Sequence, residues 1–300
     1  MGFPFRSDAH EEKWADHMRR AQERWPGKVP FESLRVNTSY GETFVRSFGK
    51  EGGRNLLLLP GAGCSSLIFA PIAAALTEQH KVYAVDSIYD IGMSRPQKGV
   101  KIESPVDLMA WLEELSLELF SAKKFSLMGF SYGGWVSAEY KLRNPEQIDK
   151  LVLLAPAAVG VGLSSQFLLR ASSCMLPYGN FTSKFYRWLA KELPYRVENG
   201  EKYIQEWIED TNTALQCYRW KSVVQPRVFP LRQFLELGSE TRILIGEDEK
   251  IYSPESFQQR IEKLNSQASL QIIPRAGHHL FHYQAQEVSQ AILNFLSKAV

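Results

Sequence analysis

Residues 125–134 of the chain read Phe-Ser-Leu-Met-Gly-Phe-Ser-Tyr-Gly-Gly, an apolar run that leads into a glycine-rich turn. A helix-like segment follows through Tyr140. Because Gly129 and Gly133 have no side chain, a strand and a helix can approach closely enough to strain the turn between them. The central residue of that turn, Ser131, then points outward, as a serine nucleophile must. The spacing of glycine and serine recurs by chance, but the flanking strand and helix favour a nucleophile over an inert turn.

The composition is that of a globular protein. The chain has 300 residues, of which 44% are hydrophobic and 23% charged, and its formal net charge is +2. This size suits one large α/β domain with an insertion. The near-neutral charge argues against a nucleic-acid partner.

The same reading gives expectations about location and redox state. No apolar run reaches the length of about 18 residues that spans a bilayer, and residues 1–10 lack a signal-like apolar core. We therefore expect no membrane span and a cytoplasmic location. Cys64, Cys174 and Cys217 are odd in number and widely separated, which favours reduced thiols over a disulfide framework.

Short apolar runs alternate with glycine-rich loops and amphipathic helices from Asn55 to Leu154, and again from Ile243 onward. This rhythm predicts an α/β fold with a mostly parallel, doubly wound sheet. Two β-rich runs between Phe31 and Phe48 predict an antiparallel hairpin at its edge. Before them, Glu11 to Trp25 has helical spacing.

We accordingly divide the chain into three parts: a helical N-terminal extension (1–30), a core (31–158 and 238–300) and a helical cap (159–237). The cap segment is rich in aromatic residues but has no clear strand pattern. Packing within the cap is favoured over substrate contact for these side chains. They are Phe167, Tyr178, Phe181, Phe185, Tyr186, Trp188, Tyr195, Tyr203, Trp207, Tyr218 and Trp220.

Chemically useful residues follow the predicted parallel strands. In open parallel sheets ligands bind beyond the carboxyl ends of the strands. A small-residue loop at 61–63, Ser131 with Tyr132, an acidic run at 247–249 and a histidine pair at 278–279 all occupy such positions. The resulting order of serine, acid and histidine is the one expected for a triad on this kind of sheet.

With these motifs the chain resembles the α/β-hydrolase fold family, in particular serine esterases of the carboxylesterase type that carry a helical cap. The resemblance rests on residues 58–63, Asp86 with 92–94, 129–134, 246–251 and 276–278. It does not cover residues 1–30, and over the cap it concerns architecture alone.

The resemblance implies a role for each matching residue. Ser131 would be the nucleophile, His278 the general base and Glu249 the triad acid, with the adjacent Asp248 as the alternative acid. The backbone N–H groups of Ala62 and Tyr132 would bind the oxyanion. One departure is Pro60-Gly61, where many relatives have His-Gly, and we expect it to alter loop support more than chemistry.

Two further features have competing interpretations. His278, His279 and His282 form a cluster, but the pattern of a histidine–glutamate metal motif is missing, so we expect neither a metal nor a cofactor. His279 and His282 are instead interpreted as rim or capping residues. Asp86 is interpreted as orienting the loop that follows it by hydrogen bonds.

The sequence thus predicts a serine hydrolase acting on a carboxylic ester of small to medium size and apolar character. Within the fold, a thioesterase, a lactonase or a C–C bond hydrolase is an alternative. A ligand-binding or signalling protein with slow turnover is the alternative from a different functional class.

Overall fold

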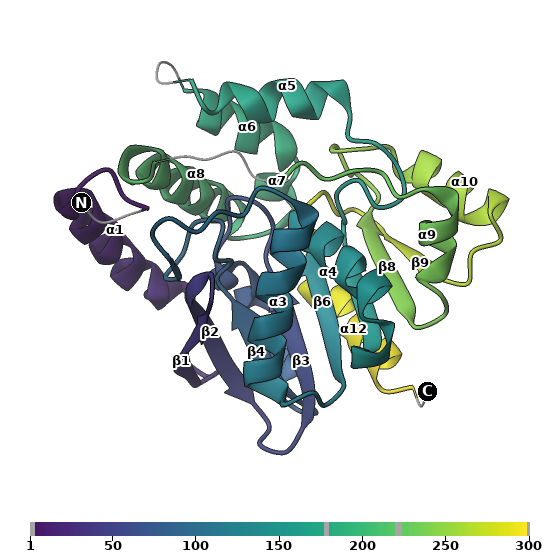
Figure 1. Ribbon diagram of the computed structural model, residues 1–300. Helices are drawn as coiled ribbons and strands as arrows, with labels where there is room; N and C mark the ends of the chain where they lie inside the picture. Colours follow the sequence, from purple (N-terminus) through teal and green to yellow (C-terminus); the bar gives the residue numbers. More distant parts are fainter. Residues whose placement is uncertain (1–3, 177–179, 220–223, 299–300) are drawn as a thin grey trace.

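The computed structural model describes residues 4–176, 180–219 and 224–298. Within them the strands form one sheet, in the order β1-β2-β4-β3-β6-β7-β8-β9, with β5 paired to β2 (Figure 1). The strands are β1 (Phe31–Thr38), β2 (Gly41–Gly49), β3 (Arg54–Leu59), β4 (His80–Val85), β5 (Arg95–Pro96), β6 (Phe125–Phe130), β7 (Ile148–Leu154), β8 (Thr241–Gly246) and β9 (Ser269–Ile273).

The sheet is parallel from β4 through β9 and antiparallel at its β1–β2 edge. The predicted hairpin is confirmed, and its turn is Ser39-Tyr40. The two-residue strand β5 lies in the irregular segment after β4 and pairs with Gly41 and Glu42. So short a strand has no periodicity that a sequence could reveal.

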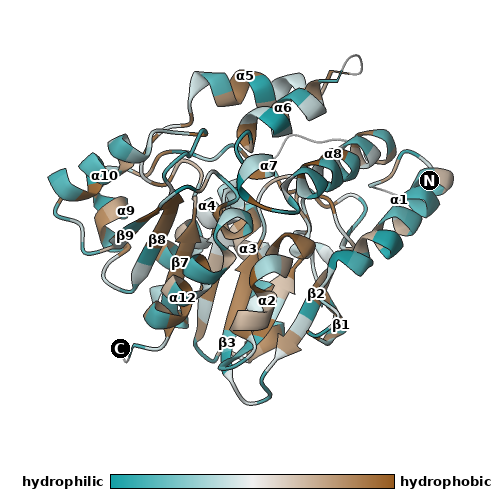
Figure 2. Ribbon diagram, turned by 180° about the vertical axis from the view of Figure 1, so that it is seen from behind, coloured by the Kyte–Doolittle hydropathy of each residue, from teal (hydrophilic) through white to brown (hydrophobic). Residues whose placement is uncertain are grey.

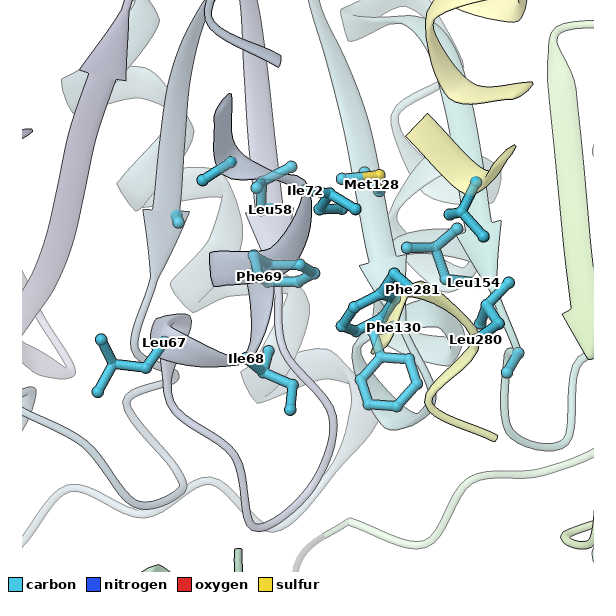
Figure 3. Packing of buried hydrophobic residues seen from close by; sticks show 14 of the residues in the cluster. Leu58, Leu67, Ile68, Phe69, Ile72, Met128, Phe130, Leu154, Leu280 and Phe281 are labelled. Carbon is cyan, nitrogen blue, oxygen red and sulfur yellow. The ribbon is translucent and has the colours of Figure 1, made fainter. Parts of the chain in front are cut away.

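Helices cover both faces of the sheet. On one face lie α3 (Pro105–Phe120) and α4 (Tyr132–Arg143), and on the other lie α2 (Ala70–Leu76) and α12 (Ala285–Leu296) (Figures 1 and 2). Successive residues of a strand point to opposite faces, so an uninterrupted apolar strand such as β3 serves both cores. Leu58 packs with Ile72 and Met128 on the α2 side (Figure 3), whereas Leu57 belongs to the core under α3.

The segment between β7 and β8 is helical in its described parts. It holds α5 (Ser165–Ser173), α6 (Phe181–Leu189), α7 (Leu193–Arg196), α8 (Gly200–Cys217) and α9 (Leu231–Glu236). Helices α5 to α8 lie beyond the carboxyl ends of the strands (Figure 1). Tyr178 and Trp220, two aromatics singled out above, lie outside the described residues. The cap boundaries at 159 and 237 stay a prediction.

The N-terminal helix α1 (Asp8–Ala21) begins earlier and ends earlier than predicted, and a 3₁₀ turn η1 (Gln22–Arg24) follows it. The side chain of Ser7 accepts a hydrogen bond from the backbone N–H of His10, which starts the helix. The spaced residues Trp14, Met18 and Ala21 are buried, as the helical periodicity predicts. The helix packs against α8 of the segment between β7 and β8.

The remaining short elements are η2 (Ser66–Phe69), η3 (Pro145–Gln147), α10 (Pro254–Lys263) and α11 (Leu280–Tyr283). Throughout the described ranges, every helix is too short or too polar to cross a membrane.

Candidate active site

The turn between β6 and α4 holds Ser131 in a strained conformation. Its φ of 52° lies in the region that favours glycine. A Cβ atom at Gly129 would lie 2.2 Å from the carbonyl oxygen of Gly133, and one at Gly133 would lie 2.4 Å from that of Leu59. The backbone N–H of Ser131 donates to the carbonyl of Leu154 over 2.9 Å. Glycine packing and the neighbouring strand therefore fix the position of the serine.

Ser131, His278 and Glu249 form a continuous chain of hydrogen bonds. The Nε2 atom of His278 lies 2.9 Å from the Oγ of Ser131. Its Nδ1 atom lies 2.8 Å from an Oε of Glu249. Because the carboxylate faces Nδ1, it favours the tautomer with the proton on Nδ1, which leaves Nε2 free to accept the serine proton.

The other carboxylate oxygen of Glu249 accepts backbone N–H groups from Lys250 (2.8 Å) and Ile251 (3.0 Å). These bonds orient the carboxylate toward the histidine. Glu249 and His278 are buried, and Ser131 is partly exposed. An oriented carboxylate in a dry setting can hold an imidazolium in place.

The two neighbouring acids have other partners. Asp248, the alternative acid, forms an ion pair with Arg196 of α7. Glu247 accepts the backbone N–H of Arg275 over 2.9 Å. Of the three consecutive carboxylates, the structure brings Glu249 to His278.

The two expected oxyanion donors occupy the ends of neighbouring elements. Ala62 follows β3, and Tyr132 is the first residue of α4, where backbone N–H groups lack a partner within the helix. The adjacent Gly63 N–H donates to Asp90 over 2.8 Å. We call residues 61–64 the oxyanion loop, and Asp90 anchors it.

Sequence reasoning missed Asp90. Its second oxygen accepts the backbone N–H of Ile91 over 2.7 Å, so both oxygens have a backbone donor. Burial raises the pKa of this carboxyl to about 6. A single acid within an irregular loop gives no pattern that could have revealed this anchor.

The interpretation of Asp86 is confirmed. One carboxylate oxygen accepts the backbone N–H of Ser66 (2.6 Å) and the other that of Met93 (2.8 Å). Gly92 (φ 146°) allows the close approach, since a Cβ there would lie 2.7 Å from the aspartate side chain. Asp86 thus ties the loop after β4 to the segment after β3.

The interpretation of His279 and His282 as rim residues is wrong, whereas His279 does occupy the N-cap position of α11, without a capping bond from its side chain. Both are buried, because α8 covers the segment that carries them. The ring of His279 stacks on that of Trp207 with centroids 4.0 Å apart, and His282 meets the ring of Tyr203 at 4.9 Å. Burial lowers the pKa of His279 well below its ordinary value and that of His282 to about 3, so both rings are neutral.

The cysteines are free thiols, as expected. Cys64 lies on the oxyanion loop, and burial raises the pKa of its thiol, which weakens it as a nucleophile. Within the described residues, no group of three histidine, cysteine or acidic side chains is placed to hold a metal ion.

The comparisons with known proteins agree with this architecture. Residues 56–291 match the family model described as the alpha/beta hydrolase family. The chain belongs to this family, and the predicted fold class is confirmed.

Two relatives from Bacillus subtilis (strain 168) match most of the chain. Carboxylesterase YbfK is 26% identical over 281 residues, which cover 91% of this chain and 89% of that protein. An uncharacterized carboxylesterase, nap, is 26% identical over 281 residues, or 91% of this chain and 88% of that protein.

Among solved structures, naproxen esterase (carboxylesterase NP) from Bacillus subtilis superposes with a TM-score of 0.83 over 97% of this chain and 99% of that one. Its sequence is 24% identical. At this identity the likeness shows a shared fold.

Proposed function

We propose that the protein is a serine hydrolase that cleaves carboxylic esters through an acyl-enzyme intermediate. The observation that carries the proposal is the hydrogen-bonded chain from Ser131 through His278 to Glu249. A serine in a strained turn, a histidine with its acceptor nitrogen toward it and an oriented carboxylate are the parts that acyl transfer requires.

In the first half-reaction, Nε2 of His278 takes the proton of Ser131 as its Oγ attacks the ester carbonyl. Glu249 stabilises the resulting imidazolium. The N–H groups of Ala62 and Tyr132 donate to the developing oxyanion. The imidazolium then protonates the leaving alcohol, and the acyl group stays on the serine. Water, activated by the same histidine, releases the acid in the second half-reaction.

The relatives support an ester as substrate, since two that match about nine-tenths of this chain are named carboxylesterases. We expect a small molecule of apolar character, because aromatic rings gather at the base and its neighbour: the ring of Phe130 lies 5.0 Å from that of His278, and Trp207 stacks on the adjacent His279. A cytoplasmic location stays a prediction from the sequence.

The test is replacement of the nucleophile. Ser131→Ala should lower ester hydrolysis by several powers of ten, because the members of a triad act as a unit. The matched control is Ser137→Ala, which removes a buried hydroxyl without a hydrogen-bond partner from α4, the helix that follows Ser131. It should leave the rate within a few-fold of the original. Near-normal hydrolysis by Ser131→Ala would refute the assignment.

A second measurement separates an esterase from a slow receptor of the same fold. A serine-directed phosphonate should label Ser131, and a short-chain ester should be turned over many times per molecule. Labelling without repeated turnover would favour the ligand-binding alternative.

A further inference from the structure

A cavity of about 220 Å³ is lined in part by residues that follow the candidate catalytic residues in the chain. Its walls come from the oxyanion loop and η2, from the cap helices α6 and α8, and from the N-terminal segment. Its lining includes Cys64, Leu67, Ile68, Tyr186, Trp207 and His282. We call it the side cavity.

The walls of the side cavity include near neighbours of both the oxyanion donors and the base. Gly63, in its wall, is the neighbour of the oxyanion donor Ala62. His282 comes from the segment that carries the base, and Trp207 stacks on His279, the residue after His278. In Figure 3, Leu67 and Ile68 lie toward the same end of the sheet as Phe130, the residue before Ser131.

Its size and walls suit one ring. A cavity of about 150 Å³ is enough to hold benzene, and the side cavity is moderately larger. Leu67, Ile68 and the indole of Trp207 offer apolar contact. His282 is neutral at working pH, because burial lowers its pKa to about 3. These walls therefore favour an uncharged, ring-sized group.

The charges at the far side of the cavity disfavour an anion. Arg24 is the cation there, and it is already bound to both oxygens of Asp210 at 2.9 and 2.8 Å. Glu206, a second carboxylate of the same wall, lies 3.8 Å from it. Lys202 also lies 4.0 Å from Glu206, and His17 lies 2.7 Å from Asp210. Arg24 is thus engaged by carboxylates of the protein and is not free to pair with an anionic substituent, which the two carboxylates would repel.

We propose that the side cavity binds the alcohol portion of the ester and selects alcohols that carry one uncharged ring. This inference rests on the proposed function. The leaving oxygen must reach Nε2 of His278, which protonates it, so the alcohol extends on the side of the base. The segment that carries His278 also supplies His282 to the cavity wall.

Three esters test the assignment: ethyl acetate without a ring, benzyl acetate with a ring on the alcohol, and ethyl phenylacetate with a ring on the acyl group. Ile68→Trp fills the side cavity from a residue that is 6% exposed. The kcat/KM ratio of benzyl acetate to ethyl acetate should fall at least about tenfold, since a pocket contact of this size changes selection by that order. The ratio of ethyl phenylacetate to ethyl acetate should not change.

The matched control is Leu169→Trp on α5, where the side chain is 72% exposed and outside the cavity. It should leave both ratios unchanged. If Ile68→Trp, and the smaller change Ile68→Phe, lower the ethyl phenylacetate ratio or move neither ratio, the assignment of the cavity to the alcohol is wrong.

Direct binding makes the test independent of turnover. Calorimetric titration of the Ser131→Ala protein should detect benzyl alcohol, and Ile68→Trp in the same background should remove the binding. The anion 4-(hydroxymethyl)benzoate should bind more weakly than benzyl alcohol, and Glu206→Gln should narrow this difference. Absence of benzyl alcohol binding would overturn the inference. Binding without ester hydrolysis by the unaltered enzyme would overturn the proposed function, and would leave the cavity as a site for an uncharged ring that is not the alcohol of an ester substrate.

Discussion

The nucleophile turn at Ser131 and the helical segment between β7 and β8 are each held in place by a different kind of contact. At the turn, a missing Cβ at Gly129 or Gly133 lets backbone atoms approach within distances that no side chain tolerates. In the helical segment, side chains make the joints: Arg196 pairs with Asp248, and Arg187 pairs with Glu201 over 2.6 Å. A close contact between backbones tolerates almost no substitution, whereas a contact between side chains can be altered by substituting one residue at a time. The chemistry is therefore rigidly specified, and the selection of substrate has room to vary.

The largest effect should come from breaking a backbone joint. Gly133→Ala places a Cβ 2.4 Å from the carbonyl oxygens of Leu59 and Pro60, neither of which can rotate away. We expect a loss of at least about 4 kcal/mol in the free energy of unfolding, and loss of esterase activity with it. Urea unfolding monitored by circular dichroism, together with an ester assay, measures both.

A glycine of the helical segment provides the control. At Gly162 the nearest atom to an added Cβ is a methyl of Val228, 3.8 Å away, which is ordinary contact. Gly162→Ala should change the unfolding free energy by no more than about 0.5 kcal/mol. Equal effects of the two substitutions would contradict the contrast between the regions.

The neighbouring acids Glu249 and Asp248 face different regions, since Glu249 contacts His278 and Asp248 contacts Arg196 of the helical segment. Glu249→Gln removes the charge beside Nδ1 of His278 and disturbs its tautomer, so kcat should fall by about 10³ to 10⁴. Asp248→Asn instead loses a partly exposed pair with Arg196 of α7. Its effect on kcat/KM should stay below about fivefold, the equivalent of 1 kcal/mol. A larger fall for Asp248→Asn would exchange the roles of the two acids.

Sequence pattern was sufficient to predict which residues lie at the carboxyl ends of the strands, because each position is fixed by neighbouring residues in the sequence. The glycines around Ser131 follow from the close approach of one strand and the next helix. The strand-end positions of Glu249 and His278 follow from the alternation of strands and helices. The same reasoning predicted Asp86 as a loop anchor, which its bonds to Ser66 and Met93 confirm.

The remaining features depend on contacts between distant segments. His279 and His282 are buried because α8, some 70 residues earlier, lies over them. Arg46 is fully buried in the sheet, with its guanidinium 4.1 Å from the ring centre of Phe31 and 4.7 Å from that of Trp25. Arginine is a residue type that is mostly found at the surface of proteins. Such placements are decided by the packing of whole elements, which periodicity within one element does not encode.

Unlike the nucleophile turn, the oxyanion loop is held by a side chain, that of Asp90, which accepts the backbone N–H of Gly63. The pKa of Asp90 is raised from 3.8 to about 6 in the folded chain. Between pH 4 and 6 the folded state thus keeps a proton that the unfolded state has lost, and stability contributed by this group falls as the pH rises. The fall amounts to about 3 kcal/mol at most.

Asp90→Asn removes this titration. The unfolding free energy of the unaltered protein minus that of the variant should therefore decrease from pH 4 to pH 7, by up to about 3 kcal/mol. Turnover should fall, since an amide offers one acceptor to the two N–H groups of Gly63 and Ile91. A difference that is constant across this pH range would show that Asp90 is not a buried, titrating anchor.

The smallest effect on the free energy of unfolding should come from breaking an ion pair between the N-terminal segment and α8. Arg24 and Asp210 are each 19% exposed and form two hydrogen bonds. Arg24→Gln therefore leaves the carboxylate of Asp210 largely buried beside that of Glu206 without its arginine partner. We expect a loss of about 2 kcal/mol, between the values for exposed and buried pairs. Arg187→Gln breaks a pair in the same helical region whose members are 46% and 50% exposed, and it should cost no more than about 1 kcal/mol. Urea unfolding at low and high salt separates them, because the shielded pair should respond less to salt. If the two substitutions cost the same and respond alike to salt, the N-terminal segment is held by its apolar face, with Trp14 and Met18, and not by this ion pair.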